Sequence, residues 1–345
     1  MKKTAFTIAA TVAILAMGIS SSSCVNDNDY ASTSPRDNFE ALWTIMDEHY
    51  CFFDVKQKQL GADWDAIHDK YVQYITEDMS QSALFEVMWD MLDELQDGHV
   101  NLSGPLESSR SWQWKDNYPR NFSEDIQRNY LGNDYSIASN GYYYKILPQN
   151  VGYLYIESFS NGISESRLDV ILSRLQICNG LIIDVRENGG GDLTTAEQVA
   201  ARFTNSRTIT GYYRYKTGKG HNDLSDYIER YIDAASTHLR WQKPTVVLAN
   251  RGCYSATNQF VSDMKCFNNI TVFGDRTGGG GGLPFSAELP NGWVIRFSAA
   301  PAYDVDEKEI ETGVAPNIVV SQTDVDRARG KDTLIEAAIG WINAL

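Results

Sequence analysis

The chain has 345 residues and a formal net charge of −15 at pH 7, with 45 acidic against 30 basic side chains. Such an acidic chain repels the phosphates of nucleic acids and the headgroups of anionic membranes, which argues against both as partners. Once a leader and a tether are set aside, the remaining length suits one large domain, or a small helical unit joined to a larger core.

The first 24 residues have the pattern of an export signal. Lys2 and Lys3 precede an apolar run over residues 5–19, and a run of serines then leads to Cys24. This order of charged, apolar and small residues is typical of a secretory signal and not of a membrane-spanning anchor. A cysteine directly after small residues resembles a lipoprotein signal. We therefore expect residues 1–24 to be a lipoprotein-type signal peptide, with Cys24 as the lipidated first residue.

This signal predicts an exported protein in the cell envelope or outer membrane of a bacterium, in contact with the membrane only through its lipid anchor. An ordinary signal peptide, cleaved elsewhere in the serine run, is the alternative. Residues 25–36 are polar, acidic and poor in large apolar side chains, so we expect a flexible tether there.

Residues 37–104 are expected to form a small helical unit. Apolar side chains recur at helical spacing in residues 39–46 and again in residues 84–95. The last of these helices is expected to deliver His99. Residues 105–140, which follow, are aromatic and polar, and are expected either to cover a sheet edge or to form a wall of a substrate groove.

Residues 105–345 are predicted to form an α/β core with a cap-like insertion near residues 212–241. From Val151 the pattern alternates between strand and helix. The expected strands lie at 153–156 and 180–185, and the expected helices at 164–175 and 194–203. This alternation is the signature of an α/β fold.

Two strand-to-helix junctions carry the chemistry. In the first, an apolar run over residues 244–249 leads through a turn to a helical pattern, with Ser255 at the helix start. Unpaired backbone N–H groups and the helix dipole favour negative charge there, as a tetrahedral oxyanion requires. Taken alone, Ser255 could equally be a simple helix cap.

The second junction, over residues 181–192, contains the glycine triplet at residues 189–191. Glycines let backbone N–H groups point into a cavity without obstruction by side chains. One such N–H, with that of Ala256, would make a two-donor oxyanion hole. A tight turn that binds nothing is the alternative.

These junctions belong to a longer series of motifs. In chain order the series runs through Asp97-Gly98-His99, residues 184–191, residues 250–258, residues 274–277 with the glycine run after them, residues 289–292 and residues 311–317. Their order and spacing make chance agreement improbable. The chain resembles the C-terminal processing peptidases and the tricorn-core serine proteases.

The resemblance implies a Clp protease/crotonase-like core of repeated ββα units behind the helical unit. It implies Ser255 as the nucleophile, with the N–H groups of Ala256 and Gly190 as the oxyanion donors. Only about fifty residues separate His99 from the strand at 153–156, too few for a complete PDZ domain, since domains are commonly of roughly 100 residues.

The choice of base depends on the branch of the family. The processing peptidases use a lysine, but Gly280 stands where it would fall. The tricorn-like branch implies His99 as the base and Glu311 as the carboxylate that orients it. Glu309 is a near neighbour that could take this role in place of Glu311. Gly98 stands where that branch has a contributing serine, which leaves a fourth member open. A histidine suits the role because it titrates near neutral pH.

No metal or organic cofactor is expected. The cysteines beyond Cys24 lie at positions 51, 178, 253 and 266, with spacings that fit no compact disulfide or zinc framework. Cys253, beside the nucleophile, is interpreted as a packing residue.

The sequence thus predicts a secreted serine peptidase that hydrolyses proteins or peptides through Ser255, His99 and Glu311. Three alternatives remain: a catalytically silent peptide- or ligand-binding module on the same fold, a small-molecule esterase, and a structural surface protein. The sequence gives neither the physiological substrate nor the oligomeric state.

Overall fold

The computed structural model describes residues 32–109 and 112–345. The predicted signal peptide, Cys24 and most of the tether therefore lie outside the described residues. Within those two segments, no helix has both the length and the apolar character needed to span a bilayer.

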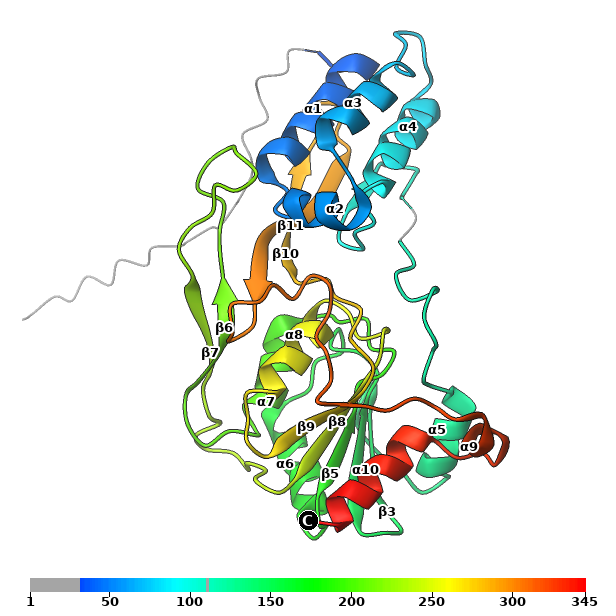
Figure 1. Ribbon diagram of the computed structural model, residues 1–345, viewed down its shortest axis with the longest axis vertical. Coiled ribbons are helices and arrows are strands. Elements are labelled where there is room, and N and C mark those ends of the chain that lie inside the picture. Colours follow the sequence, from blue (N-terminus) through cyan, green and yellow to red (C-terminus); the bar gives the residue numbers. More distant parts are fainter. Residues whose placement is uncertain (1–31, 110–111) are drawn as a thin grey trace, which may run out of the picture.

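Four helices begin the described chain: α1 (Pro35–His49), α2 (Phe53–Leu60), α3 (Trp64–Val72) and α4 (Gln81–Asp93). The sequence sets three of their starts, because Ser34, Asp63 and Ser80 each accept a hydrogen bond from a backbone N–H of the first turn. These helices lie together at one end of the molecule (Figure 1).

The helical unit shares its core with strands from the C-terminal half. Strands β10 (Gly282–Glu288) and β11 (Val294–Tyr303) pair with each other, and β1 (Asn101–Ser103) adds to the other edge of β11. Trp293, Ile295 and Phe297 are buried in the same hydrophobic cluster as the apolar faces of α1 and α4. The hairpin of β10 and β11 therefore ties the helices to the rest of the fold (Figure 1).

The same sheet continues from β11 to β6 (Thr208–Tyr213) and β7 (Ile228–Ile232), giving the order β1-β11-β6-β7 with β10 beside β11. All its pairings are antiparallel. The hairpin of β6 and β7 lies in the part of the chain where an insertion was expected.

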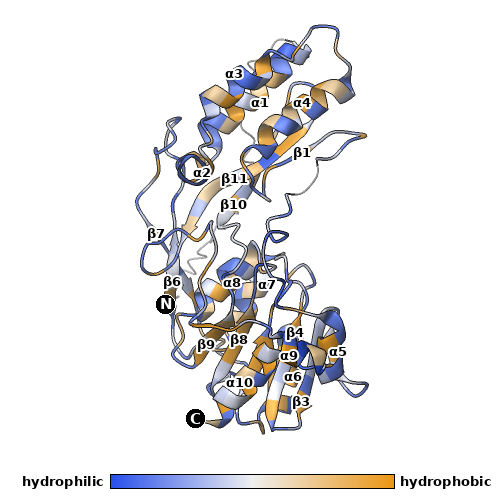
Figure 2. Cartoon of the chain, turned by 45° about the vertical axis from the view of Figure 1, so that its right-hand side comes forward, coloured by the Kyte–Doolittle hydropathy of each residue, from blue (hydrophilic) through white to orange (hydrophobic). Residues whose placement is uncertain are grey.

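The second sheet has seven strands in the order β12-β9-β8-β5-β4-β3-β2. Its strands are β2 (Ser136–Ser139), β3 (Tyr142–Leu147), β4 (Val151–Ile156), β5 (Leu181–Asp184), β8 (Thr245–Ala249), β9 (Ile270–Gly274) and β12 (Ile318–Val319). The five neighbouring strands β12, β9, β8, β5 and β4 pair in parallel. Every residue of β5 and β8 is buried. Central parallel strands are covered on both faces, which explains their continuous apolar runs (Figure 2).

Helices cover both faces of this sheet. One face packs on α6 (Glu165–Leu175), α7 (Leu193–Ala200) and α8 (Ala256–Met264). The other face packs on α5 (Glu124–Leu131) and α10 (Thr333–Asn343), and the short α9 (Asp324–Ala328) precedes α10 (Figure 1). The predicted α/β fold is confirmed, and the predicted helix at 194–203 ends earlier, at Ala200.

Candidate active site

Ser255 lies in the turn between β8 and α8, and its side chain makes no capping hydrogen bond to the helix. The alternative of a simple helix cap is therefore not what the structure has. Its backbone has φ 55° and ψ −122°, a conformation that residues other than glycine rarely adopt. A hydrogen bond of 2.9 Å from the Ser255 N–H to the Gly279 carbonyl supports this turn.

His99 reaches Ser255 from the far end of the chain. Its Nε2 lies 2.9 Å from the Ser255 Oγ, so the two side chains are within hydrogen-bond distance. We expected His99 to lie in the last helix of the helical unit. It lies instead in a turn that follows the end of α4 at Asp93. The chain needs this turn because β1, which follows directly, must pair with β11.

The His99 ring is buried, with 4% of its surface exposed. Burial lowers the pKa of His99 to about 4, even though the Asp97 carboxylate opposes this change. The imidazole is therefore neutral at neutral pH, and its Nε2 can accept the proton of the Ser255 hydroxyl.

A hydroxyl group, not a carboxylate, faces the other ring nitrogen. Ser298 Oγ on β11 lies 3.5 Å from His99 Nδ1 and donates to Asp97 Oδ2 at 3.3 Å. Asp97 also accepts from the Tyr50 hydroxyl at 2.9 Å and from the His99 backbone N–H at 2.8 Å. With the proton on Nδ1, His99 donates to Ser298 and Ser298 donates to Asp97. Nε2 is then the hydrogen-bond acceptor of the ring.

No sequence pattern singled out Ser298. Its hydroxyl comes to His99 only through the pairing of β1 with β11, which joins segments 195 residues apart in the chain. No local pattern carries that information. Asp97 was noticed as part of a motif, but without a function.

Glu311 is brought into the same region, but not into hydrogen bonding with His99. Its Oε1 accepts from Lys56 Nζ at 3.1 Å, and its Oε2 accepts from the Gly281 N–H at 2.8 Å. Burial raises the pKa of Glu311 to about 7, although the Lys56 ammonium opposes this change. The expected orienting carboxylate is thus part of an ion pair with α2, and its contacts differ from those the resemblance implied.

Glu309, the alternative candidate for the orienting carboxylate, forms an isolated β-bridge with Tyr303 at the end of β11. Burial raises its pKa to about 7 as well. Lys56, which was not singled out from the sequence, is only 4% exposed and also donates to the Gln96 carbonyl at 3.3 Å.

The glycine triplet lies directly against Ser255. A Cβ added to Gly190 would meet the Tyr254 carbonyl at 2.7 Å and the Ser255 Cβ at 2.9 Å, so only glycine allows this approach. However, the Gly190 N–H donates to Asn188 Oδ1 at 2.9 Å and is already engaged.

Two other N–H groups remain available. Those of Ala256 and Gly191 have no acceptor among the described residues. Both residues line, with Ser255, a cavity of about 290 Å³. The geometry therefore keeps Ala256 as an oxyanion donor and favours Gly191 over Gly190 as the second one.

The glycine run after residue 277 is packed against the neighbouring segments of the site. Gly278 N–H donates to the Cys253 carbonyl at 2.7 Å, and Gly280 N–H donates to the Glu311 carbonyl at 3.2 Å. A Cβ on Gly279 would lie 1.9 Å from that same Glu311 carbonyl oxygen. The backbone bonds of this turn hold Glu311 and the nucleophile turn together, and no side chain fits at Gly279.

The aromatic segment after residue 105 supplies Trp114, which stacks on Tyr254 with ring centroids 4.1 Å apart. Trp112 and Trp114 line a second cavity of about 280 Å³, together with Lys56 and Glu311. Of the two expectations for this segment, the wall of a groove agrees better with these contacts than the cover of a sheet edge.

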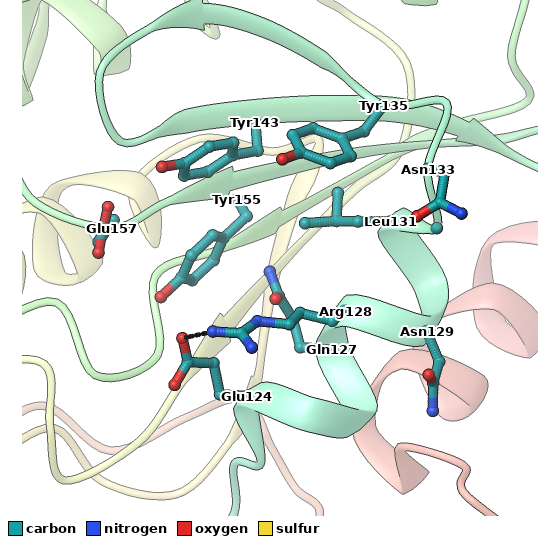
Figure 3. Close-up of a pocket in the computed structure, with 11 residues that line it drawn as sticks. Glu124, Gln127, Arg128, Asn129, Leu131, Asn133, Tyr135, Tyr143, Tyr155 and Glu157 are labelled. Carbon is teal, nitrogen blue, oxygen red and sulfur yellow. Dashed lines mark hydrogen bonds and ion pairs between the residues drawn. The ribbon is translucent and has the colours of Figure 1, made fainter.

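A further pocket of about 710 Å³ lies between α5 and strands β3 and β4, where Tyr135, Tyr143 and Tyr155 line one side and Glu124 and Arg128 the other (Figure 3). It shares no lining residue with the cavity at Ser255. It is therefore a separate surface feature. Within the described segments, no group of three or more His, Cys, Asp or Glu side chains is placed to hold a metal ion.

The chain matches two family models. Residues 150–320 match peptidase family S41, and residues 32–93 match the tricorn protease C1 domain. Among curated relatives, the carboxy-terminal processing protease CtpA of Bacillus subtilis is 25% identical over 178 residues, 51% of this chain and 36% of the relative. A carboxy-terminal-processing protease of Bartonella bacilliformis is 27% identical over 157 residues, 45% of this chain and 34% of the relative. The chain spans about a third of the length of these relatives.

Solved structures agree with this match over most of the chain. A protein of Parabacteroides merdae named "putative peptidase" is 49% identical, with a TM-score of 0.83 over 90% of this chain and 97% of that one. Mature CPAF in complex with lactacystin, at 13% identity, shares the fold with a TM-score of 0.68 over 91% of this chain and 100% of that one. These matches confirm the resemblance drawn from the motifs, and the chain belongs to peptidase family S41.

Proposed function

We propose that this chain is a serine peptidase in which Ser255 is the nucleophile and His99 is the general base. The observation that carries the proposal is the 2.9 Å approach of His99 Nε2 to Ser255 Oγ. Family membership supports the reaction class, and the carboxy-terminal processing proteases among the relatives support proteins or peptides as substrates.

The reaction follows from the geometry. Ser255 Oγ attacks the carbonyl carbon of the scissile peptide bond while its proton passes to His99 Nε2. The negative charge on the carbonyl oxygen is stabilised by the N–H groups of Ala256 and Gly191. His99 then gives the proton to the departing amine, which leaves an acyl-enzyme. A water molecule, deprotonated by His99, attacks the acyl carbon. As the ester bond breaks, His99 returns this proton to Ser255 Oγ, and the acyl group leaves as a carboxylic acid.

Ser298 and Asp97 take the orienting role in this mechanism. The Ser298 hydroxyl accepts a hydrogen bond from His99 Nδ1–H and donates one to Asp97, so the imidazole is held in the tautomer that leaves Nε2 free to accept. Burial opposes the charge of Asp97, but Lys56 and His99 keep its pKa below the ordinary value. The Asp97 carboxylate is therefore ionised when His99 becomes an imidazolium, and it stabilises that charge.

The Lys56–Glu311 ion pair contacts neither His99 nor Ser255 through a hydrogen bond. Its two bonds join α2 to the glycine turn that also holds the Ser255 N–H through Gly279. We assign this pair to positioning the nucleophile turn, in place of direct contact with His99.

The test is covalent labelling with a fluorophosphonate probe, using protein expressed without the signal peptide. The wild type should be labelled, and Ser255→Ala and His99→Ala should not. A folded wild type that resists labelling would contradict the proposal and favour the silent binding module. Parallel rates on activated esters and on peptides separate a peptidase from an esterase.

We further propose that the protein is exported and anchored by a lipid on Cys24, on the strength of the leader pattern. Metabolic labelling with a palmitate analogue should modify the full chain and not its Cys24→Ser variant. Equal labelling of both chains would contradict the anchor.

A further inference from the structure

Arg296 shares a cavity with Ser255 and makes no ion pair with a carboxylate among the described residues. It is on β11, two residues before Ser298, so both side chains lie on the same face of the strand. Arg296 lines the cavity of about 290 Å³ that contains Ser255 and Ala256. Its hydrogen bond to Asn101 Oδ1 is long, at 3.4 Å.

Arg296 is partly buried, and three buried arginines of this fold are each paired with a carboxylate. Arg186 contacts Asp184 at 2.6 Å, Arg202 contacts Asp169 at 2.6 Å, and Arg230 contacts Asp263 at 3.1 Å. Among the described residues, no carboxylate lies within ion-pair distance of Arg296.

Burial lowers the pKa of Arg296, although Asp97 opposes this change. Asp97 acts on Arg296 only through its charge and makes no hydrogen bond to it, because the Asp97 oxygens accept from Tyr50, Ser298 and the His99 backbone. A partly desolvated guanidinium without a carboxylate partner is costly, and a carboxylate is the group it binds best, through two parallel hydrogen bonds.

A second donor lines the same cavity. Gln259 on α8 is 5% exposed and lies in the cavity wall. Its Oε1 accepts from the Tyr213 hydroxyl at 2.7 Å, and its Nε2 has no partner among the described residues. Asp192 is the carboxylate of the lining, and its Oδ1 already accepts from the Thr194 N–H at 2.7 Å as the cap of α7. The cavity thus offers N–H donors that lack an acceptor.

We propose that the cavity at Ser255 is a carboxylate-binding subsite, in which Arg296 holds a carboxylate of the substrate next to the scissile bond. This inference rests on the proposed peptidase function. The carboxylate can come from a glutamate or aspartate side chain or from the free C-terminus of a peptide. Both present the same planar pair of oxygens to a guanidinium.

The competing role for Arg296 is purely electrostatic. Its positive charge is one of the influences that lower the pKa of His99. An arginine that acts only through His99 affects all substrates alike, whereas an arginine that binds a carboxylate affects only substrates that carry one. Matched pairs of substrates therefore separate the two roles.

The experiment uses a peptide mixture to find cleaved sequences by mass spectrometry, followed by two matched pairs. One pair exchanges glutamate for glutamine beside the cleaved bond, and the other exchanges a free C-terminus for a C-terminal amide. For one of the pairs, the wild type should show at least a tenfold higher kcat/KM for the acid, since a charge-assisted hydrogen bond of this kind gives about 10- to 100-fold. The pair that shows the preference identifies the source of the carboxylate.

In Arg296→Gln this ratio of acid to amide should fall towards one, and in Arg296→Glu it should invert. Arg207→Gln is the matched control, because it removes an exposed arginine paired with Asp233 at the start of β6 and should keep the wild-type ratio. Equal losses for acid and amide peptides in Arg296→Gln, or no preference in the wild type, would overturn the subsite.

Binding tests the subsite without turnover. Fluorescence anisotropy of labelled acid and amide peptides on Ser255→Ala should show at least tenfold tighter binding of the acid form, lost in Ser255→Ala/Arg296→Gln. If the wild type resists the fluorophosphonate but this difference appears, the peptidase function fails and the subsite stands. If the wild type is labelled and no difference appears, only the subsite fails.

Discussion

Replacing Ser298 by alanine removes the hydroxyl that joins His99 to Asp97. The two hydrogen bonds that are lost measure 3.5 Å and 3.3 Å, and both are longer than a normal hydrogen bond. Each is therefore worth less than the roughly 1.5–3 kcal/mol of a strong bond to a charged group. Together we expect a loss of about 1–2 kcal/mol of transition-state stabilisation, a decrease in kcat of about 5- to 30-fold.

The assay is the second-order rate of fluorophosphonate labelling, together with kcat and KM for one cleaved peptide. The loss should appear in kcat with little change in KM, because the hydroxyl contacts the base and not the substrate. Ser139→Ala is the control, since it removes an exposed serine hydroxyl from β2 in the other sheet.

An unchanged labelling rate in folded Ser298→Ala would refute the orienting role of Ser298. Glu311 would then again be the candidate for the group that orients His99. A fall in melting temperature must be measured beside it. A variant that unfolds early while its rate per folded molecule is normal would show that Ser298 is structural only.

Three further outcomes are expected. Because burial holds the pKa of His99 at about 4 and only the neutral ring accepts a proton, the labelling rate should rise with pH through about 4 and be level above about 6, whereas a midpoint near 6.5 would contradict this. Lys56→Met leaves the buried Glu311 without its partner and should lower the free energy of unfolding by about 3–5 kcal/mol in chemical denaturation, with Lys56→Met/Glu311→Gln recovering part of it. Gly279→Ala places a Cβ 1.9 Å from a carbonyl oxygen and should slow labelling and lower the melting temperature, whereas Gly162→Ala, with nothing within 4 Å, should do neither.

Local sequence was enough to predict many of the helices and strands, and to single out Ser255 and His99. The apolar runs at β5 and β8 indicated buried strands. The glycine triplet indicated a backbone N–H that points into a cavity, although the N–H of Gly190, the residue chosen, is bonded to Asn188. The ordered motifs predicted the family, and they nominated Ser255 and His99, which lie 2.9 Å apart. These features could be found because each depends on a short stretch of chain.

Only the tertiary structure decided what surrounds that pair. The neighbours of His99 depend on how β11 pairs with β1 of the helical unit and with β6, which no local pattern describes. The same pairing puts Ser298 at the imidazole and Arg296 in the nucleophile's cavity, and the buried Lys56 takes Glu311 as its partner. A strand fixes which faces its side chains share, but its pairing with distant segments fixes what those faces meet.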